Sequence, residues 1–377
     1  MQSFALTGAR VFDGESWLQD ATVVIQDERI DQVLSQAPSG DLPTINLQGG
    51  VLAPGFIDLQ VNGGGGVLLN NAPTPDTLFK MVQGHRQKGT TSFLPTVISD
   101  TPDTLGSCIN AVAHAMAECP ALLGIHIEGP FFNVLKRGVH QEKFIRRCGP
   151  QDFQLLTSLP NGKTLVTLAP EEVPAEFIEQ LVGAGVRVSA GHSNASFEET
   201  QVGISRGISG FTHLFNAMSP MTGRHPGVVG AALSADDCWV GIIADGLHVH
   251  PASIRLTVNA KPRGKTFLVS DAMATAGSDI QTFMLYGEEI REQQGGLVNS
   301  EGKLAGSAIG MVDAVRYCVE TVGLDLGETL RMASLYPAQY LGIDKKLGRI
   351  ETGMRADLVH LSEQLQVKNT WVAGQSN

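Results

Sequence analysis

Short runs of apolar residues recur through the middle of the chain, and most are followed by glycine, serine or another turn-forming residue. Runs of about four to eight apolar residues bounded in this way are typical of buried strands. The pattern predicts eight strands, at residues 56–61, 91–96, 122–128, 164–169, 186–191, 210–215, 240–245 and 266–271.

Several connections between these strands have the spacing of amphipathic helices. Thr74-Pro75 and Thr101-Pro102 each place a capping residue before a proline, which favours a helix start. We expect helices in 75–89, 101–118, 174–185, 196–207 and 250–260, and two closing helices in 311–323 and 327–342.

Strands that alternate with helices predict an α/β protein, here a (β/α)8 barrel of the TIM type. An open doubly wound sheet is the alternative. No Gly-x-Gly-x-x-Gly motif follows the first strand, and the run Gly63–Gly66 is expected to be a loop. The barrel is therefore the preferred interpretation.

The two ends of the chain have a different texture. Residues 1–52 contain short β-branched runs interrupted by Gly, Asp and Pro, and residues 345–377 repeat that pattern. We therefore predict a small β-sandwich built from both termini, at 1–52 and 345–377, around a barrel domain at 53–344.

Composition narrows the range of partners. The 377 residues include 38 acidic and 27 basic side chains, for a net charge of −11, which disfavours nucleic acid and anionic membranes. Five scattered cysteines without a Cys-x-x-Cys pair are expected to be free thiols in a reducing compartment. No apolar stretch approaches the roughly 20 residues that span a bilayer, and no signal peptide is evident at the N-terminus. We expect a cytoplasmic protein.

Four polar residues stand in or directly after predicted strands: Glu128 and Asp271 end theirs, His192 follows one, and His213 lies within 210–215. Because the C-terminal ends of barrel strands surround one mouth, these side chains are expected to converge. Two imidazoles and a carboxylate bind a divalent ion and leave one position open for water. We assign Glu128, His192 and His213 as metal ligands.

The ion is expected to be Zn²⁺, with Fe²⁺, Mn²⁺ and Co²⁺ as alternatives that the same donors accept. Such an ion lowers the pKa of bound water to about 7. Asp271 is then the candidate general base, which returns the proton to a leaving nitrogen as general acid.

Other histidines lie near the same strand ends. His248, in IADGLHVHP, is expected to stabilise an oxyanion through its ring N–H. His126 shares a strand face with Glu128 and is expected to pack beside the ligands. His250 precedes Pro251 and is interpreted as a helix-entry residue.

Two cationic segments, KRGVHQ (136–141) and TGRHPG (222–227), follow the Glu128 and His213 loops. His140 and Arg224 could form charge-assisted hydrogen bonds to a phosphate. Asn216 and the backbone around 304–308 could bind sugar hydroxyls. Exposed basic residues are usually only solvated, so by themselves these residues are candidate contacts for a phosphate and for hydroxyl groups.

The sequence resembles the amidohydrolase superfamily and, within it, the N-acetylglucosamine-6-phosphate deacetylase family. The motifs that carry the resemblance span the chain: APGFIDLQVNGGGG, GIHIEGPFF, KRGVH, AGHSNA, THLFNAMSPM, IADGLHVH, VSDAMA and LAGSA. The resemblance implies a barrel with a terminal β-sandwich. It also implies hydrolysis of the acetamide of N-acetylglucosamine 6-phosphate to glucosamine 6-phosphate and acetate.

The resemblance also implies roles for individual residues. Glu128, His192 and His213 match the family's metal ligands, Asp271 its acid/base, and His248 the residue that polarises the substrate carbonyl. In this family the phosphate of the substrate is partly held by a neighbouring subunit, so the resemblance implies that Arg224 acts across a homodimer. The matching substrate contacts are Val139, His140, Asn216, Ala217, Arg224, His248, Leu304, Ala305 and Gly306.

One departure concerns the end of the first barrel strand. Many amidohydrolases carry His-x-His there for a second metal, whereas this chain has Gln60 and Asn62. Neutral amides are poor ligands beside imidazole, so we predict one metal ion. Gln60 could hydrogen-bond the water of that ion.

Three alternatives stay open. The substrate could be the galactosamine epimer, because the two sugars differ at one hydroxyl. The chain could be a non-catalytic scaffold that binds sugar phosphates, although it keeps all four site residues. A cyclic amidase or deaminase would more naturally carry the His pair or a lysine at the end of the fourth strand, where TLVTLAPE has none.

Overall fold

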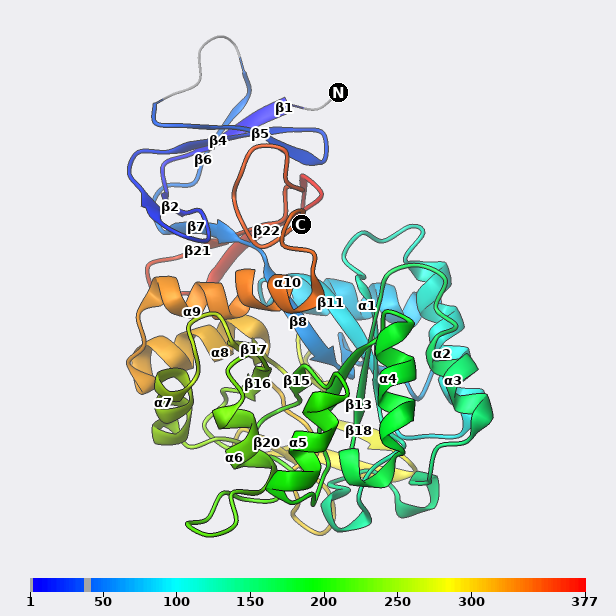
Figure 1. Ribbon diagram of the computed structural model, residues 1–377. Coiled ribbons are helices and arrows are strands. Elements are labelled where there is room, and N and C mark those ends of the chain that lie inside the picture. Colours follow the sequence, from blue (N-terminus) through cyan, green and yellow to red (C-terminus); the bar gives the residue numbers. More distant parts are fainter. Residues whose placement is uncertain (1–2, 37–41) are drawn as a thin grey trace.

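The computed structural model describes residues 3–36 and 42–377 and has two parts, a barrel and a smaller pair of sheets at one end of it (Figure 1). Each barrel strand pairs in parallel with the next, in the order of the chain. The predicted barrel is confirmed, and each predicted strand has a counterpart. The eight are β8 (Phe56–Val61), β11 (Thr90–Ile98), β12 (Gly124–Glu128), β13 (Lys163–Leu168), β14 (Arg187–Ala190), β15 (Gly210–Phe211), β16 (Trp239–Ile243) and β17 (Thr266–Val269).

The ring closes where β8 meets the residues that follow β17, a junction that we call the barrel seam. The N–H of Asp271 donates to the carbonyl of Gln60 at 3.0 Å, and that of Asn62 donates to Ala272 at 2.9 Å. Asp58 adds a side-chain link, because its carboxylate accepts from the N–H of Ser270 at 3.2 Å and from its hydroxyl at 2.5 Å. The seam therefore includes one predicted catalytic residue, Asp271.

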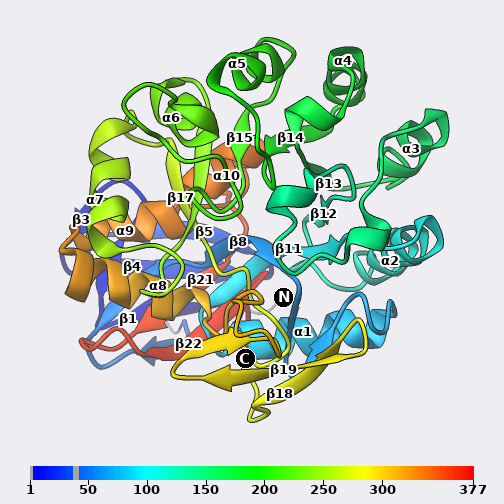
Figure 2. The same cartoon turned by 90° about the horizontal axis from the view of Figure 1, so that it is seen from below.

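Helices cover the outside of the barrel (Figure 2). Thr74 and Thr101 cap the first two, as predicted, by accepting from the N–H groups of Thr77 and Thr104. The predicted helices with direct counterparts are α1 (Pro75–Arg86), α2 (Pro102–Ala115), α4 (Ala175–Gly183), α5 (Phe197–Ser205) and α7 (Pro251–Ala260).

Two helices were not predicted, because their sequences lack the helical period of apolar residues. Helix α3 (Pro150–Leu156) is short, and α6 (Gly227–Ser234) reads GVVGAALS, which has no polar face to reveal a helical period. The predicted helix at 327–342 is two helices, α9 (Leu326–Ala333) and α10 (Leu335–Leu341). Pro337 has no N–H for the carbonyl of Ala333, so it fits in the first turn of a new helix, α10, but not in the interior of one continuous helix. Helix α8 (Met311–Tyr317) continues as a π turn, Cys318–Val322.

The two ends of the chain form a β-sandwich, as predicted. Strand β7 (Val51–Pro54) pairs with β21 (Leu358–Leu361), so an N-terminal strand lies beside a C-terminal one. Between the sheets lies a core that includes Leu6, Val23 and Trp371. The division at residues 52 and 344 stays a prediction. One sheet contains β1 (Ser3–Thr7), β4 (Thr22–Gln26), β5 (Arg29–Leu34) and β6 (Thr44–Asn46). The other contains β2 (Arg10–Phe12), β3 (Trp17–Leu18), β7, β21, β22 (Val367–Val372) and β23 (Gln375–Ser376).

A third sheet, which the sequence pattern did not predict, follows the last barrel strand. It consists of β18 (Thr282–Leu285), β19 (Glu288–Gln293) and β20 (Gly296–Val298), drawn in yellow in Figure 2. We call it the insert sheet. Its inner residues pack against Leu68 and Ile98 near the C-terminal ends of the barrel strands. The Gly63–Gly66 loop contributes a two-residue hairpin, β9 (Gly63–Gly64) and β10 (Val67–Leu68).

Two sequence-based expectations concern the chain as a whole. All five cysteines are unpaired, as predicted. In the part of the chain that the structure describes, no helix is both long and apolar enough to cross a bilayer.

Candidate active site

The predicted site residues leave their strands through unusual backbone. His192, His213 and Asp271 each lie two residues beyond the end of a strand, with φ of 51°, 36° and 52°. Non-glycine residues rarely adopt this left-handed region, which costs on the order of 1–3 kcal/mol per residue and is concentrated at functional sites. It also ends β14, β15 and β17 earlier than the apolar runs predicted. Glu128 is the last residue of β12 and precedes a cis Gly129–Pro130 bond.

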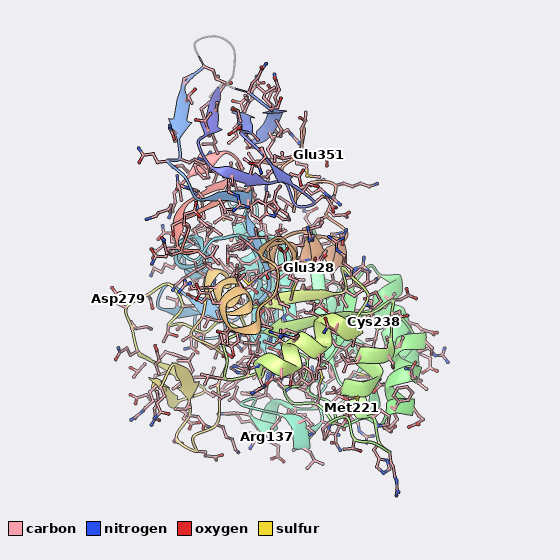
Figure 3. The ribbon with its side chains drawn as sticks, turned by 90° about the vertical axis from the view of Figure 1, so that its left-hand side faces the viewer. Arg137, Met221, Cys238, Asp279, Glu328 and Glu351 are labelled. Atoms are coloured by element: carbon pink, nitrogen blue, oxygen red, sulfur yellow. The ribbon has the colours of Figure 1, made fainter. Side chains whose placement is uncertain are left out.

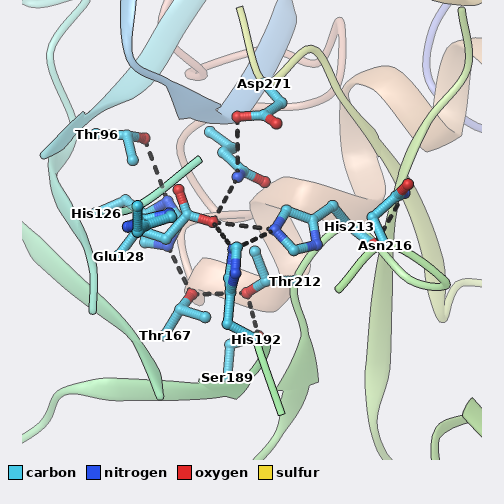
Figure 4. A network of polar contacts seen from close by, with 12 residues as sticks. Thr96, His126, Glu128, Thr167, Ser189, His192, Thr212, His213, Asn216 and Asp271 are labelled. Atoms are coloured by element: carbon cyan, nitrogen blue, oxygen red, sulfur yellow. Dashed lines mark hydrogen bonds and ion pairs between the residues drawn. The ribbon is translucent and has the colours of Figure 1, made fainter. Parts of the chain in front are cut away.

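Glu128, His192 and His213 meet above the barrel core (Figure 4). The Nε2 atoms of the two histidines lie 3.0 Å apart, and they lie 3.3 and 3.1 Å from Oε1 of Glu128. Tetrahedral zinc has bonds of about 2.0–2.1 Å to nitrogen, which places ligand atoms about 3.3 Å apart. The donor set and its spacing therefore fit one divalent ion.

The hydrogen bonds of the histidine rings decide which of them can bind an ion. Nδ1 of His192 lies 2.9 Å from the carbonyl of Lys136, to which it can only donate, so Nε2 carries the free lone pair. His140 also lies close enough to Glu128 and His192 to form a three-residue cluster. However, its Nδ1 accepts the N–H of Ser99 at 3.2 Å, so a neutral ring holds its proton on Nε2. A neutral His140 therefore presents an N–H to the cavity rather than a lone pair, and Nε2 of His213 is the third atom whose spacing fits an ion.

The buried ionisable groups of this cluster shift one another's pKa values. Burial alone would raise the pKa of Glu128, but the adjacent imidazoles of His192 and His213 hold that pKa well below its usual value. Burial lowers the pKa of His192, and it lowers that of His140 to about 3. Burial would also lower the pKa of His213, but its hydrogen bond to Glu128 outweighs burial and raises that pKa. Metal binding requires neutral imidazoles, so His213 must release any proton that it holds when an ion binds.

Asp271 stands beside the cluster and is held by two amides. Its Oδ1 accepts from Nε2 of Gln60 at 3.1 Å and from Nδ2 of Asn62 at 2.7 Å. Gln60 also donates to Oε1 of Glu128 at 3.0 Å. Burial and the charge of Glu128 raise the pKa of Asp271 to about 6. The carboxyl is therefore poised to exchange a proton near neutral pH.

His248 forms a dyad with a residue that sequence analysis left without a role. Its Nδ1 lies 2.6 Å from Oδ2 of Asp245, whose Oδ1 accepts the backbone N–H of His248 at 2.8 Å. Burial raises the pKa of Asp245, but the hydrogen bond from His248 outweighs it and leaves the pKa below its usual value. With Nδ1–H engaged, the ring donates through Nε2 only when it is protonated.

A cavity of about 180 Å³ opens beside these groups. Figure 3 shows which end of the molecule this is. Arg137, the residue before the lining residue Gly138, lies at the end opposite to the β-sandwich, as does Met221, whereas Glu351 lies near the sandwich. The predicted residues that line the cavity are Glu128, Val139, His140, His192, His213, Asn216, Ala217, His248, Asp271, Leu304 and Gly306; Asn62, Ile98, Gly138, Ile243 and Met273 complete it.

Two predicted substrate contacts lie outside this cavity. Arg224 is exposed on the 221–225 loop. Ala305 is fully buried, and its N–H donates to the carbonyl of Leu297 at 2.9 Å. Within a single chain, neither residue reaches the cavity.

Two other histidines near the site form hydrogen bonds that support the fold. His126 is buried beside Glu128, 3.2 Å from Oγ1 of Thr96 and 2.7 Å from Oγ1 of Thr167 (Figure 4). His250 caps α7 by accepting the N–H of Ala252, consistent with a helix-entry residue.

Sequence analysis missed the residues that hold the predicted ones in place. Asp245 ends a predicted strand three residues before His248, and that spacing was the available signal. Asn62 was considered only as a poor metal ligand, whereas it donates to Asp271. Ser99 follows β11 directly, but nothing in the sequence connects it to His140, which is 41 residues away.

Comparisons with known proteins agree with this geometry. Residues 51–376 match the amidohydrolase family model, and residues 3–52 match a model described as the NagA composite domain. N-acetylgalactosamine-6-phosphate deacetylase of Shewanella sp. (strain ANA-3) is 40% identical and covers 98% of this chain and 94% of its own. N-acetylglucosamine-6-phosphate deacetylase of Haemophilus influenzae is 36% identical, with 98% of each chain covered. The crystal structure of N-acetylglucosamine-6-phosphate deacetylase from Pasteurella multocida superposes with a TM-score of 0.96 at 39% identity, over 100% of this chain and 99% of that one.

Proposed function

Because this chain belongs to the amidohydrolase family, we propose that it is a metal-dependent deacetylase that hydrolyses the acetamide of N-acetylglucosamine 6-phosphate. The products are glucosamine 6-phosphate and acetate. The observation that carries the proposal is the convergence of Glu128, His192 and His213 beside Asp271 in one cavity. The full-length similarity to N-acetylhexosamine-6-phosphate deacetylases supports the choice of substrate.

Glu128, His192 and His213 are the proposed ligands of one divalent ion. Zn²⁺ is the first candidate, and Fe²⁺, Mn²⁺ and Co²⁺ suit the same oxygen and nitrogen donors. When bound, the ion supplies Lewis acidity to the substrate carbonyl and acidity to water. The amides of Gln60 and Asn62 occupy the place of a His pair, which supports a single ion.

Asp271 is the proposed acid/base. Both amide donors reach Oδ1, so we assign Oδ2 as the oxygen that takes a proton from the attacking water. The same oxygen then delivers that proton to the sugar nitrogen as the C–N bond breaks. Gln60 and Asn62 orient the carboxyl for both transfers.

His248 is the proposed donor to the acetamide oxygen. Asp245 holds its Nδ1–H, so the protonated ring presents Nε2–H to the charge that develops on that oxygen. Asp245 compensates the positive charge of the ring and fixes its orientation.

The cavity residues Val139, His140, Asn216 and Ala217, with Leu304 and Gly306, are the proposed sugar contacts. Ala305 would act through its neighbours. Arg224 is exposed in one chain, which is consistent with a homodimer in which it reaches the partner's phosphate. A cytoplasmic location fits a catabolic enzyme for a phosphorylated sugar.

A second candidate substrate is N-acetylgalactosamine 6-phosphate, favoured by the 40% identity to the Shewanella deacetylase. The two epimers leave the reacting acetamide unchanged, so both fit the mechanism above. Measurement of kcat/KM on both 6-phosphates distinguishes the candidates.

The decisive experiment measures acetate release from N-acetylglucosamine 6-phosphate together with metal content. We expect turnover in samples that hold one divalent ion per chain and loss of turnover after chelation. A metal-loaded sample that releases no acetate from either epimer would refute the proposal.

A further inference from the structure

The hairpin between β18 and β19 carries a tyrosine in a conformation that tyrosine rarely adopts. Tyr286 and Gly287 have φ of 54° and 83°. A two-residue turn with both φ values positive favours asparagine or glycine at its first position, because a side chain there is strained. The contacts of the Tyr286 side chain must therefore offset that cost.

Those contacts connect the insert sheet to two loops beside the cavity. The Tyr286 hydroxyl donates to the carbonyl of Ser99, directly after β11. Its ring packs on Phe144, with centroids 5.5 Å apart, and its carbonyl accepts Nε2 of Gln141 at 3.3 Å. Ser99 adjoins Ile98 and Gln141 adjoins His140, so Tyr286 contacts the direct neighbours of two residues that line the cavity.

Ser99 transmits the contact to His140. It is fully buried, and both its N–H (3.2 Å) and its hydroxyl (2.9 Å) reach Nδ1 of His140. A backbone N–H can only donate, so Nδ1 must be the acceptor and the neutral ring carries its proton on Nε2. His140 lines the cavity, and this proton is the one that its ring can offer to a ligand.

We propose that Tyr286 is a positioning residue for sugar-phosphate binding that acts through Ser99 on His140. The Tyr286 hydroxyl restrains the peptide unit after Ser99, while the N–H and hydroxyl of Ser99 contact His140, so loss of the Tyr286 contact frees Ser99 to move relative to the ring. That N–H sets the tautomer and the orientation of the His140 ring. The identity of the ligand rests on the proposed function, whereas the coupling between Tyr286 and His140 does not.

The first test is Tyr286→Phe, which removes one oxygen and keeps the ring on Phe144. The matched control is Tyr336→Phe, which removes a hydroxyl that donates to Glu328 at 2.8 Å on the helical side of the barrel. We expect kcat/KM to fall roughly threefold to tenfold in Tyr286→Phe only, mostly through KM, as for the loss of one hydrogen bond. Metal content should match wild type. An unchanged KM, or an equal loss in the control, contradicts the proposal.

A double-mutant cycle with His140→Ala tests the route of the effect. If Tyr286 acts through His140, adding Tyr286→Phe to His140→Ala should leave the affinity for glucosamine 6-phosphate, measured by calorimetry, unchanged. Equal losses in the presence and absence of the His140 ring would show that Tyr286 acts by another route and would overturn the proposal.

A spectroscopic measurement separates this proposal from the proposed function. Nitrogen NMR of histidine-labelled protein should show His140 with its proton on Nε2 in wild type and a mixture of tautomers or a broadened signal in Tyr286→Phe. If wild type fails to release acetate while this change is seen, the proposed function fails and the positioning role stands. An identical His140 signal in both proteins overturns the positioning role.

Discussion

At the scale of single residues, hydrogen bonds define the proposed roles of the site residues more closely than positions in the sequence do. Strand ends alone predicted that Glu128, His192, His213 and Asp271 would converge, because barrel strands share one mouth. They could not predict that amides from Gln60 and Asn62 hold Asp271, because that contact joins β8 to the far side of the seam. Roles taken from resemblance alone, as for Ala305, do not follow from the single-chain geometry.

Asp271→Asn tests the acid/base role. The variant should keep its fold and its metal but lose about 10²–10⁴-fold in kcat, the usual contribution of general acid–base catalysis. The measurement is acetate release with metal analysis, and Asp279→Asn, on an exposed part of the same segment, is the control. Turnover within a fewfold of wild type would remove Asp271 from this role.

The pKa of Asp271 also predicts a pH profile. A general base must be deprotonated, so kcat/KM should decline as the pH falls through about 6, and a bound cation moves this limb to lower pH. The hydrogen bond from Asn62 lowers this pKa. Asn62→Ala should therefore shift the acidic limb upward, and a limb that stays in place would mean that another group controls it.

His192→Ala tests the ligand assignment. Removing one of three donors should lower the metal content of purified protein by about 10-fold or more, as measured by elemental analysis. His126→Ala removes a neighbouring imidazole without a proposed ligand atom and should retain far more metal. Full occupancy in His192→Ala would exclude it as a ligand.

At the scale of elements, regular hydrophobic patterns in the sequence predicted strands and helices correctly, whereas irregular patterns did not. The eight barrel strands were predictable because buried parallel strands are continuous apolar runs. The insert sheet was not, since its short strands alternate polar residues around Phe283 and Ile290. Helix α6 failed for the opposite reason, because it is apolar on every side.

The carboxyl group of Asp58, in the seam between β8 and β17, leads to a prediction about the pH dependence of stability. Burial raises the pKa of Asp58 to about 7, above its unfolded value near 3.9. A raised carboxyl pKa means that the folded state binds the proton more tightly, so this group's contribution is present below about pH 4 and is lost as the pH rises through 7.

Asp58→Asn removes that titration. In urea unfolding, the stability of wild type relative to Asp58→Asn should decrease between pH 5 and pH 7.5. A difference that is constant or rises with pH would contradict the assignment. The comparison between the two proteins cancels the other titrating groups that they share.

At the scale of the whole molecule, the sequence indicated the sandwich but not how one chain meets another. Arg224 lies outside the cavity, which leaves the proposed action across a homodimer to be tested. Alone, Arg224→Ala should raise KM for the phosphorylated sugar far more than for the unphosphorylated one.

Mixing two weak variants tests the subunit arrangement. In a hybrid of Arg224→Ala and Asp271→Asn chains, one site keeps its own Asp271 and receives Arg224 from the partner. Activity should therefore recover to a substantial part of wild type after co-refolding. If each chain supplies its own Arg224, neither site is intact and no recovery follows.

The pairing of β7 with β21 has a consequence for biosynthesis. A ribosome releases β7 early and β21 only after the whole barrel sequence has been translated. The barrel strands can pair with their neighbours in the order of their emergence, and β7 can pair with β2, whereas the other edge of β7 must wait for β21. Maturation of the nascent polypeptide should therefore finish with the capture of the C-terminal strands, after translation has passed residue 361.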